Sequence, residues 1–389
     1  MSNDLVIHVK SIGSITPLGH DESSILAAFR HQYSRIGQVR FGDDIHWAAK
    51  IPSESEAHLE AFVRHHSFVR RADRTVHLAV YASEMAVNES GWNVKEIEAI
   101  NFGSSRGATG MWEEHYQSFL KNKRSHVKTS PYTTLGNISS HVATFFQRKG
   151  IAIDHSMTCS SGLLSIINGI AWLKSGLCQR FLAGASEAPI TPFTLSQMQA
   201  LGIYSKEEGP FPCKSLDLHK KRNTMVLGEG AIAVCLELKP FSELEKEDIF
   251  LSGWGMSKEM VESPSGISLD GKALREAMLS ALSSGTVPDL VIAHAPGTVQ
   301  GDSAEWNAIQ SVFGDMLPTI TSTKWKTGHL LGASGLMSLE MGFYALKKGV
   351  SSHVPYLNTT DQFENNPISF MVNSIGFGGN AVSLIFAKK

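Results

Sequence analysis

Short apolar runs rich in β-branched residues alternate along this chain with longer segments whose apolar positions recur every three or four residues. The first pattern is typical of buried strands and the second of amphipathic helices. Because the two patterns keep alternating, the sequence predicts an α/β fold. We expect strand and helix segments in residues 5–32, 97–105, 151–188, 230–238, 273–296, 333–349 and 381–389.

Helix starts carry plausible capping residues, such as Asp21 and Asp302. No low-complexity linker divides the chain, but the charged, proline-containing segment 237–250 follows a predicted strand. We place there a boundary between two α/β halves, residues 1–240 and 241–389. Sequence repetition between the halves is too weak to establish duplication.

Composition narrows the function classes. The chain has 389 residues, 42% of them hydrophobic, so a sizeable core can form. Its net charge of -2 gives no overall basic field for nucleic acid or an anionic membrane. No apolar stretch approaches a membrane span, and the N-terminus lacks a signal-peptide pattern. Four cysteines without zinc-like or CxxC spacing indicate reduced thiols, so we expect a cytoplasmic protein with no metal site.

Cys159 is the first candidate for chemistry. It stands in "SMTCSSG", between a β-like run and an amphipathic segment. At such a turn, the unpaired N–H groups and positive dipole of the helix end would stabilise a thiolate and lower the pKa of Cys159. Free cysteines are, however, usually inert core residues. This stretch alone leaves both interpretations open.

Two histidines in glycine-containing loops favour the catalytic interpretation of Cys159 over the structural one. His294 ends a β-like run in "IAHAPGT", and His329 lies in "KWKTGHLLGASG", five residues after Lys324. Glycine lets backbone approach a ligand closely, and functional residues often occupy such loops. Either histidine alone would more often be structural. A cysteine, two histidines and a lysine on three separate turns rarely coincide by chance and predict one active site.

The order of these motifs resembles that of β-ketoacyl-[acyl-carrier-protein] synthases of the thiolase superfamily, specifically the elongating branch with a Cys-His-His site. The similarity runs nearly end to end. It implies a thiolase-like fold in which two similar halves form a layered αβαβα architecture. The further motifs that carry it are "VKSIGSITPLGHDESSILAAFRHQYSRIG", "GNISSHVATFFQRKG", "LAGASEAPITPFTLSQMQALG", "VLGEGA" and "NSIGFGGNAVSLIF".

The resemblance also implies residue roles. Cys159 would take the acyl chain as a thioester, while His294 and His329, as neutral imidazoles, would stabilise the enolate formed as CO2 leaves malonyl carrier. Lys324 would order the charges around the second histidine. The N–H groups of Cys159 and Phe377 would form an oxyanion hole, with the Phe377 side chain as a gate. No cofactor is implied beyond the phosphopantetheine that carries the substrates.

The chain departs from the family pattern at several positions. "HAPGT" keeps Thr298, which would contact the phosphopantetheine arm, but has Pro296 at the first threonine position. Asn380 replaces a threonine near the C-terminus, and Ser338 stands where a carboxylate is expected, with Glu340 displaced by two. These changes put the charge network around the site lysine in question.

Neighbouring acidic residues fit supporting roles. Asp302 and Glu305 follow the first histidine loop, and we expect them to cap a helix and orient neighbours rather than to transfer protons. We interpret Glu229, in "VLGEGA", as structural support.

Partners follow from the same resemblance. Arg70, Arg71 and Arg74 have helix-like spacing and resemble the family helix that docks acidic acyl carrier protein, although a charge cluster is usually only a solvated face. Relatives are dimers that bury the nucleophile strand. We therefore expect a dimer, either with a second copy or with a catalytically inactive ketosynthase homologue.

We therefore expect a decarboxylative condensing enzyme of fatty acid, polyketide or aryl polyene biosynthesis that releases a 3-ketoacyl carrier. The alternative is a non-condensing, chain-length-factor-like partner subunit, against which the retained cysteine and histidines argue. A degradative thiolase would need a second catalytic cysteine near the C-terminus, and all four cysteines precede residue 240.

Overall fold

The computed structural model describes residues 4–134, 137–260, 266–350, 353–357 and 366–389. The strands are β1 (Leu5–Ile15), β2 (Gly37–Phe41), β3 (Asp44–Ala48), β4 (Ala99–Gly103), β5 (Ile151–His155), β6 (Arg180–Glu187), β7 (Gly230–Pro240), β8 (Ile249–Lys258), β9 (Leu290–Ile292), β10 (Thr319–Thr321), β11 (Ser369–Gly376) and β12 (Asn380–Lys388). The α-helices are α1 (Glu22–Arg30), α2 (Ser53–His65), α3 (Arg74–Ser90), α4 (Thr109–Asn122), α5 (Thr129–Thr133), α6 (Asn137–Phe145), α7 (Ser161–Lys174), α8 (Pro192–Ala200), α9 (Lys272–Leu282), α10 (Val299–Phe313), α11 (Lys324–Thr327) and α12 (Ser334–Lys348). Short 3-10 turns are η1 (Val94–Glu96), η2 (Phe241–Glu243) and η3 (Leu331–Ala333).

Two five-strand units with the same topology make up the large sheet. The first has the order β5-β4-β6-β7-β1 and the second β10-β9-β11-β12-β8. In the first unit β1 pairs antiparallel with β7 and β7 antiparallel with β6, while β6 pairs parallel with β4 and β4 parallel with β5. The second unit repeats this pattern, with β8–β12 and β12–β11 antiparallel and β11–β9 and β9–β10 parallel. The fold therefore has the two similar α/β halves that were expected. β7 ends at Pro240 and β8 begins at Ile249, on either side of the predicted boundary.

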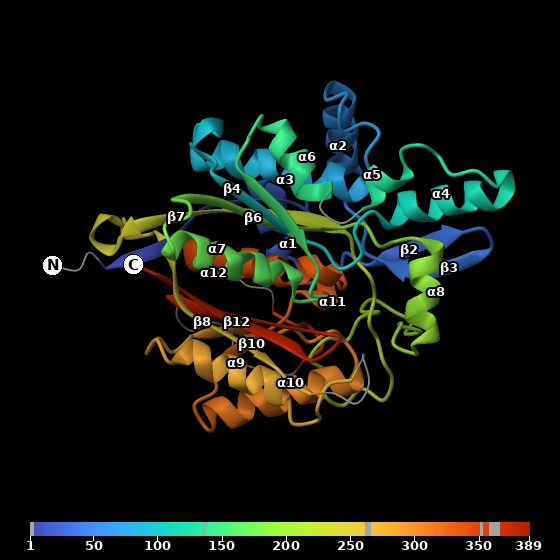
Figure 1. The fold of residues 1–389 in the computed structure, drawn as a ribbon. Helices are drawn as coiled ribbons and strands as arrows, with labels where there is room; N and C mark the ends of the chain where they lie inside the picture. Colours follow the sequence, from blue (N-terminus) through green and yellow to red (C-terminus); the bar gives the residue numbers. More distant parts are fainter. Residues whose placement is uncertain (1–3, 135–136, 261–265, 351–352, 358–365) are drawn as a thin grey trace.

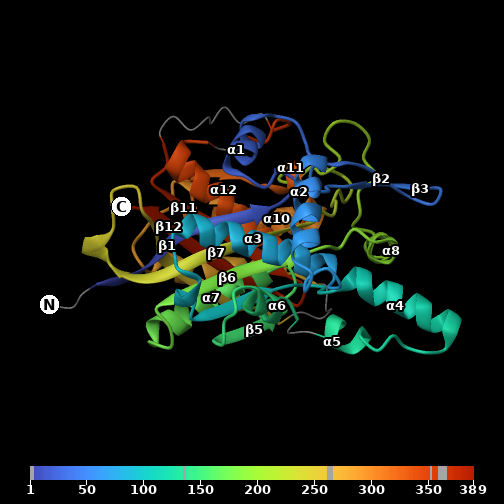
Figure 2. The same cartoon turned by 90° about the horizontal axis from the view of Figure 1, so that it is seen from above.

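The elements stack in layers (Figure 1). Helices α3 and α6 cover the outer face of the first unit, α9 and α10 cover the outer face of the second, and α7 and α12 lie between the two units. Seen from above, α4 and α5 project to one side of these layers (Figure 2). The layers have the αβαβα order of the expected thiolase-like architecture. No helix among the described residues is long and apolar enough to span a membrane.

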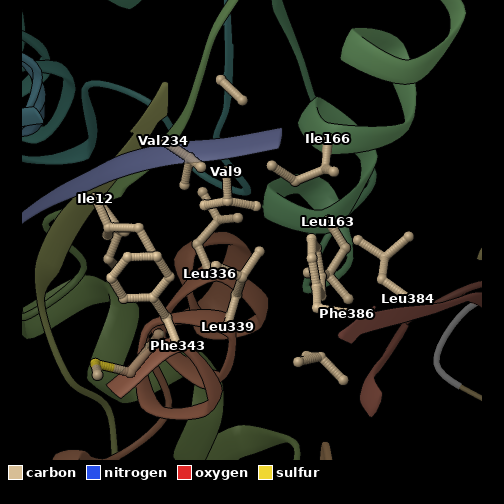
Figure 3. Close-up of a cluster of buried hydrophobic side chains, with 14 of the residues drawn as sticks. Val9, Ile12, Leu163, Ile166, Val234, Leu336, Leu339, Phe343, Leu384 and Phe386 are labelled. Carbon is tan, nitrogen blue, oxygen red and sulfur yellow. The ribbon is translucent and has the colours of Figure 1, made fainter. Parts of the chain in front are cut away.

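Helices α7 and α12, which form the layer between the two strand units, are surrounded mainly by apolar side chains. Figure 3 shows Leu163 and Ile166 of α7, and Leu336 and Leu339 of α12, among side chains from both units, including Val234. Burying one such side chain contributes about 1.5–3 kcal/mol, so this contact holds both helices firmly.

The starts of the two central helices meet. A Cβ on Gly162, near the start of α7, would lie 2.7 Å from the carbonyl oxygen of Gly332 in η3, so no larger residue fits there without a shift. Cys159 precedes one of these helix starts and His329 the other. The packing that brings the helices together thus brings these two residues together.

Predicted helix starts were partly wrong. Asp21 caps α1, with its Oδ1 accepting from the Ser24 N–H at 3.0 Å. Asp302, however, lies inside α10, which Thr298 caps by accepting from the Gly301 N–H at 3.1 Å. Thr298 lies directly before the first helical residue, where its hydroxyl can accept from a free backbone N–H of the first turn, so the helix begins four residues earlier than predicted.

Candidate active site

Cys159 lies on a tight turn between β5 and α7. Thr158 before it has a φ of +50°, an unfavourable conformation for a β-branched residue. The Ser161 hydroxyl donates to the Thr158 carbonyl at 2.7 Å, and the hydroxyl of Ser374, on β11 of the other half, donates to the Cys159 carbonyl at 3.0 Å. Contacts from both halves therefore fix the position of Cys159.

The structure brings the predicted cysteine and both histidines together. Cys159 Sγ and ring nitrogens of His294 and His329 all lie within 4.8 Å of one another. The two imidazole rings have centroids 5.2 Å apart and cross at 80°. All three residues are buried. His294 follows β9 and His329 follows α11, so the site combines both halves of the fold.

Hydrogen bonds define the tautomer of His329. Its Nδ1 accepts from the Leu331 N–H at 3.0 Å and lies 2.8 Å from the Ser334 hydroxyl. An accepting Nδ1 carries no proton, so in the neutral ring Nε2 is the donor. Burial and the charge of Lys324 hold the pKa of both His329 and His294 well below the ordinary value. Both rings are therefore neutral at physiological pH.

Lys324 and Glu305 form the charged part of the site. Burial lowers the pKa of Lys324 to about 8, an effect that Glu305 and Cys159 partly offset. Burial raises the pKa of Glu305, which accepts from the N–H groups of His294 at 2.9 Å and Ala295 at 2.7 Å. Glu305 thus orients the first histidine loop, the role expected for it.

Asp302 holds the rest of the loop that contains His294 through hydrogen bonds. Its carboxylate accepts from the Gly297 N–H at 2.9 Å, the Leu216 N–H at 2.8 Å and Lys220 Nζ at 2.7 Å. Asp302 orients neighbours as expected, although it is not the helix cap.

The predicted lowering of the Cys159 pKa was wrong. Burial raises the pKa of Cys159 to about 12; the nearby Lys324 partly offsets this and Glu187 adds to it. The free energy lost when a thiolate is removed from water exceeds the stabilisation that a helix N-terminus gives it. The cysteine is therefore a neutral thiol at rest and must lose its proton as it reacts.

Glu187, at the end of β6, is a site residue that sequence reasoning missed. Its Oε1 accepts from the N–H groups of Ser105 and, at 3.0 Å, Gly332. Burial raises the pKa of Glu187 to about 7. The carboxylate ties the loop after His329 to the first half. The signal available in the sequence was an acidic residue ending an otherwise uncharged run, "FLAGASE".

Phe377 lies in the turn between β11 and β12 and is 40% exposed. A Cβ on its neighbour Gly376 would lie 1.8 Å from Thr158 Oγ1 and 3.1 Å from the Cys159 nitrogen, so only glycine fits there. The backbone at Phe377 therefore runs directly beside the nucleophile turn.

A thiol and imidazoles are donors that zinc accepts, so the cluster of Cys159, His294 and His329 has the chemistry of a possible metal site. The buried ammonium of Lys324 opposes a cation there, because it already lowers the pKa of both histidines. We assign no metal to the site.

Comparison with known proteins decides the family. Residues 7–240 match the β-ketoacyl synthase N-terminal domain and residues 250–358 match the β-ketoacyl synthase C-terminal domain. The chain belongs to the β-ketoacyl synthase family.

Similar proteins of this family come from several organisms. The chain is 28% identical to nodulation protein E of Rhizobium leguminosarum bv. trifolii over 359 residues, which cover 89% of this chain and 88% of that protein. It is 25% identical to 3-oxoacyl-[acyl-carrier-protein] synthase 2 of Coxiella burnetii over 409 residues, covering 98% of each.

Solved structures show the same fold. The ishigamide ketosynthase/chain length factor matches with a TM-score of 0.82 at 19% identity, covering 99% of both chains. A β-ketoacyl synthase from Burkholderia phymatum STM815 matches with a TM-score of 0.80 at 22% identity, also covering 99% of both.

The three candidate docking arginines do not form one helical face in this family member. Arg70 and Arg71 are exposed in the turn before α3. Arg74 instead forms ion pairs with Glu56 at 2.6 Å and Glu229 at 2.8 Å. Two carboxylates from distant segments hold the Arg74 guanidinium, so Arg74 has a structural role; its part in carrier docking stays a prediction. Glu229 has the supporting role expected for it.

Arg74→Met should destabilise the fold by about 3 kcal/mol, because it leaves the buried carboxylate of Glu229 without its partner. Arg70→Met is the matched control, since Arg70 is exposed and donates only to the Arg64 carbonyl among described residues. Chemical denaturation measures both. Equal stability of the two variants would contradict the structural role of Arg74.

Glu340, the displaced carboxylate, does not serve the site lysine. It is 1% exposed on α12, and one of its oxygens has no hydrogen-bond partner among described residues. Burial raises its pKa to about 7. The groups that raise the pKa of Lys324 are instead Glu305, Asp302 and the nearby cysteines, so the Ser338 departure leaves that network in place.

Glu340→Gln should change how stability depends on pH. The folded state holds the Glu340 proton up to about pH 7 while the unfolded chain releases it near pH 4.5, so the wild type loses stability as pH rises through that window. Glutamine does not titrate. Relative to wild type, the variant should gain about 2 kcal/mol between pH 5 and pH 8. The same measurement on exposed Glu60→Gln should show no such gain, and a pH-independent difference for Glu340→Gln would contradict the assignment.

Proposed function

We propose that this protein joins an acyl chain held as a thioester on Cys159 to the carbanion derived from a malonyl-carrier thioester, releasing CO2 and a 3-ketoacyl carrier. The observation that carries the proposal is the buried cluster of Cys159 Sγ with two neutral imidazoles, all within 4.8 Å. A nucleophile beside two neutral donors fits acyl transfer followed by enolate formation. Membership of the β-ketoacyl synthase family supports the same reaction class.

Acyl transfer begins at the neutral thiol of Cys159. Its sulfur bonds to the acyl carbonyl carbon, the carrier sulfur leaves, and the thiol proton passes to that leaving group through an adjacent imidazole. The transient oxyanion would accept hydrogen bonds from the N–H groups of Cys159 and Phe377. A Cβ on Gly376 would lie 3.1 Å from the Cys159 nitrogen, which places the two backbone segments side by side and supports this pairing.

Decarboxylation then needs stabilised negative charge. When the C–CO2 bond of the malonyl group breaks, its electron pair forms an enolate, and the N–H donors of His294 and His329 would bind the enolate oxygen. Lys324 helps by keeping both rings neutral, since its charge lowers their pKa. The enolate carbon bonds to the acyl carbonyl carbon, and Cys159 leaves as a thiolate, which takes a proton from solvent.

Carrier recognition involves Thr298, Arg70 and Arg71 in this proposal. Thr298 caps α10 as an acceptor, which leaves its hydroxyl hydrogen free for a phosphopantetheine oxygen. A relative by fold is described as a type II polyketide synthase acyl-carrier protein in complex with its ketosynthase. The exposed arginines before α3 would meet the acidic carrier surface.

Reversing both charges, Arg70→Glu with Arg71→Glu, should raise KM for acyl carrier about tenfold, because rim charges govern encounter and register. Loading from a small acyl thioester should not change, since that substrate does not use the carrier surface. Steady-state loading assays with the two donors measure the difference. An unchanged KM for acyl carrier would exclude these arginines from docking.

Strand β5 ends the ten-stranded sheet on the side of the first unit, and this edge supports a dimer. Ile151 and Ile153 on β5 are 39% and 45% exposed, which is unusual for apolar strand residues. One fold relative is described as a ketosynthase in complex with its chain length factor. We propose that β5 pairs with a second ketosynthase-type chain, either a second copy or a homologue.

The four cysteines are buried and free. We propose that the protein works in a reducing compartment such as the cytoplasm, where these thiols stay reduced.

A non-condensing partner subunit is the second candidate. Chain length factors among the fold relatives support it. The intact Cys159, His294 and His329 cluster favours the condensing enzyme.

The test is reconstitution. Purified protein is incubated with acyl carrier and malonyl carrier, and products are identified by mass. The proposal expects 3-ketoacyl carrier and an equal amount of CO2. A folded protein that yields neither product alone but supports product formation by a ketosynthase homologue would be a non-condensing subunit. One that yields neither product in both settings would contradict both candidates.

A further inference from the structure

Lys326 is a buried lysine that the proposed reaction does not use. It lies on α11, two residues after Lys324, and is 1% exposed. Lysine is seldom buried so deeply without a charged partner. The charge that acts on Lys326 is that of Arg35, which has the same sign and adds to the effect of burial, so the pKa of Lys326 falls to about 7.

Backbone carbonyls at the end of α1 hold the Lys326 side chain. Its Nζ donates to the carbonyl of Ala28 at 2.5 Å, to that of Phe29 at 3.3 Å and to that of His31. The last carbonyls of a helix lack intrahelical partners and lie at its negative dipole end, so they bind an amine well. An ammonium has a donor for each of the three, and the neutral amine keeps two. Lys326 thus joins α11 to the C-terminal end of α1.

The segment after α1 also holds the backbone of α11. The Ser34 hydroxyl donates to the Trp325 carbonyl at 3.0 Å, and the Arg35 N–H donates to the Lys326 carbonyl at 2.9 Å. Helix α11 has only four residues, too few to keep its position through its own hydrogen bonds. Residues 28–35 therefore determine where α11 lies.

Lys324 extends from the same turn into the active site. Residues two apart in a helix do not share a face, so Lys324 and Lys326 leave α11 on different sides. His329, by contrast, has its own backbone support: its N–H donates to the Val226 carbonyl at 2.6 Å and its carbonyl accepts from the Gly228 N–H at 3.0 Å. A displacement of α11 would therefore move Lys324 more than His329.

We propose that Lys326 is a positioning residue for the condensation: it anchors α11 to the end of α1 and so fixes the Lys324 ammonium beside the two imidazoles. Its side chain contacts α1 rather than the reacting groups. This inference rests on the proposed function, since it takes enolate stabilisation by neutral histidines as the step that Lys324 supports.

The pH profile of decarboxylation reports the position of Lys324. Its charge lowers the pKa of both histidines, so moving it away raises those pKa values. The other titratable groups of the site, Cys159, Glu187 and Glu305, lie on other elements and keep their places. A protonated His329 carries a hydrogen on Nδ1 and cannot accept from the Leu331 N–H, so activity should be lost as pH falls through its pKa.

The experiment measures CO2 release from malonyl carrier by protein already acetylated on Cys159, as a function of pH. Lys326→Met should still acetylate fully, release CO2 about tenfold more slowly at pH 7, and lose activity on the acid side at a higher pH than wild type. Lys326→Arg, which keeps a cation with several donors, should recover part of the rate.

Two further variants separate positioning from general stability. Ser34→Ala removes one hydrogen bond at the partly exposed surface of the same anchor, so it should fold, slow CO2 release about threefold and shift the acid side in the same direction. His8→Ala is the control: His8 is 2% exposed and pairs with Glu237 and Asp248, so its loss should lower stability and leave the acid side unchanged.

An unchanged acid side in folded Lys326→Met and in Ser34→Ala would overturn the inference, even if the rates fell, and would leave Lys326 a residue of the fold alone. If Lys326→Met does not fold, Ser34→Ala decides in the same way. Folded wild type that neither acetylates on Cys159 nor releases CO2 would instead refute the proposed function.

Discussion

Cys159→Ala should abolish acyl loading, lowering the rate by roughly 10³-fold or more, as expected when a nucleophile is removed. Cys159 Sγ is the only thiol in the described structure that lies with the two histidines. Incubation with acyl carrier followed by intact-protein mass spectrometry measures the covalent acyl group. The fold should be unaffected, because the substitution removes one buried sulfur atom and no hydrogen bond of the turn backbone.

Cys178→Ala is the matched control, since Cys178 is also a buried free thiol but lies just before β6 and outside the cluster of Cys159 with the two histidines. This variant should load as wild type does. Acyl mass that persists on the Cys159→Ala protein would move the nucleophile to another residue.

His329→Ala should leave loading largely intact and slow condensation by roughly 10²–10³-fold, the usual cost of one lost oxyanion donor. The reason is that His329 Nε2 is the free donor of a ring whose Nδ1 is already occupied by the Leu331 N–H. CO2 release from malonyl carrier, measured with protein already acylated on Cys159, reports this step. His329→Asn, which restores a neutral N–H donor, should recover part of the rate.

The exposed His219 provides the control for His329. His219→Ala should decarboxylate malonyl carrier at the wild-type rate. If His329→Ala also kept that rate, enolate stabilisation would have to be assigned to other groups.

Local pattern was enough to predict the fold class. The strand and helix alternation and the cap at Asp21 depend on neighbours along the chain, which a sequence displays. The grouping of Cys159 with two histidines joins distant segments, and it was predicted from the coincidence of their residue types on separate turns and from the family resemblance. The αβαβα layering followed from the resemblance to a known family. The folded chain repeats one strand topology in both halves, a regularity that the sequence was too diverged to show.

Properties that depend on distant segments could not be predicted. The pKa of Cys159 follows from burial by both halves, which outweighs the helix end visible in the sequence. Arg74 turned out to pair with Glu229, 155 residues away, so its spacing from neighbouring arginines did not reveal this structural role. Glu187 reaches the site only because the loop at Gly332 packs against the end of β6.

The most direct test of the account is a single-turnover chase. Protein is acylated on Cys159, freed of excess donor and mixed with malonyl carrier, and the acyl group on the Cys159 peptide, CO2 and carrier products are followed together. The account predicts that the acyl group leaves Cys159 at the same rate as CO2 and 3-ketoacyl carrier form. Loss of the acyl group as free acid, or CO2 release while Cys159 stays acylated, would contradict it.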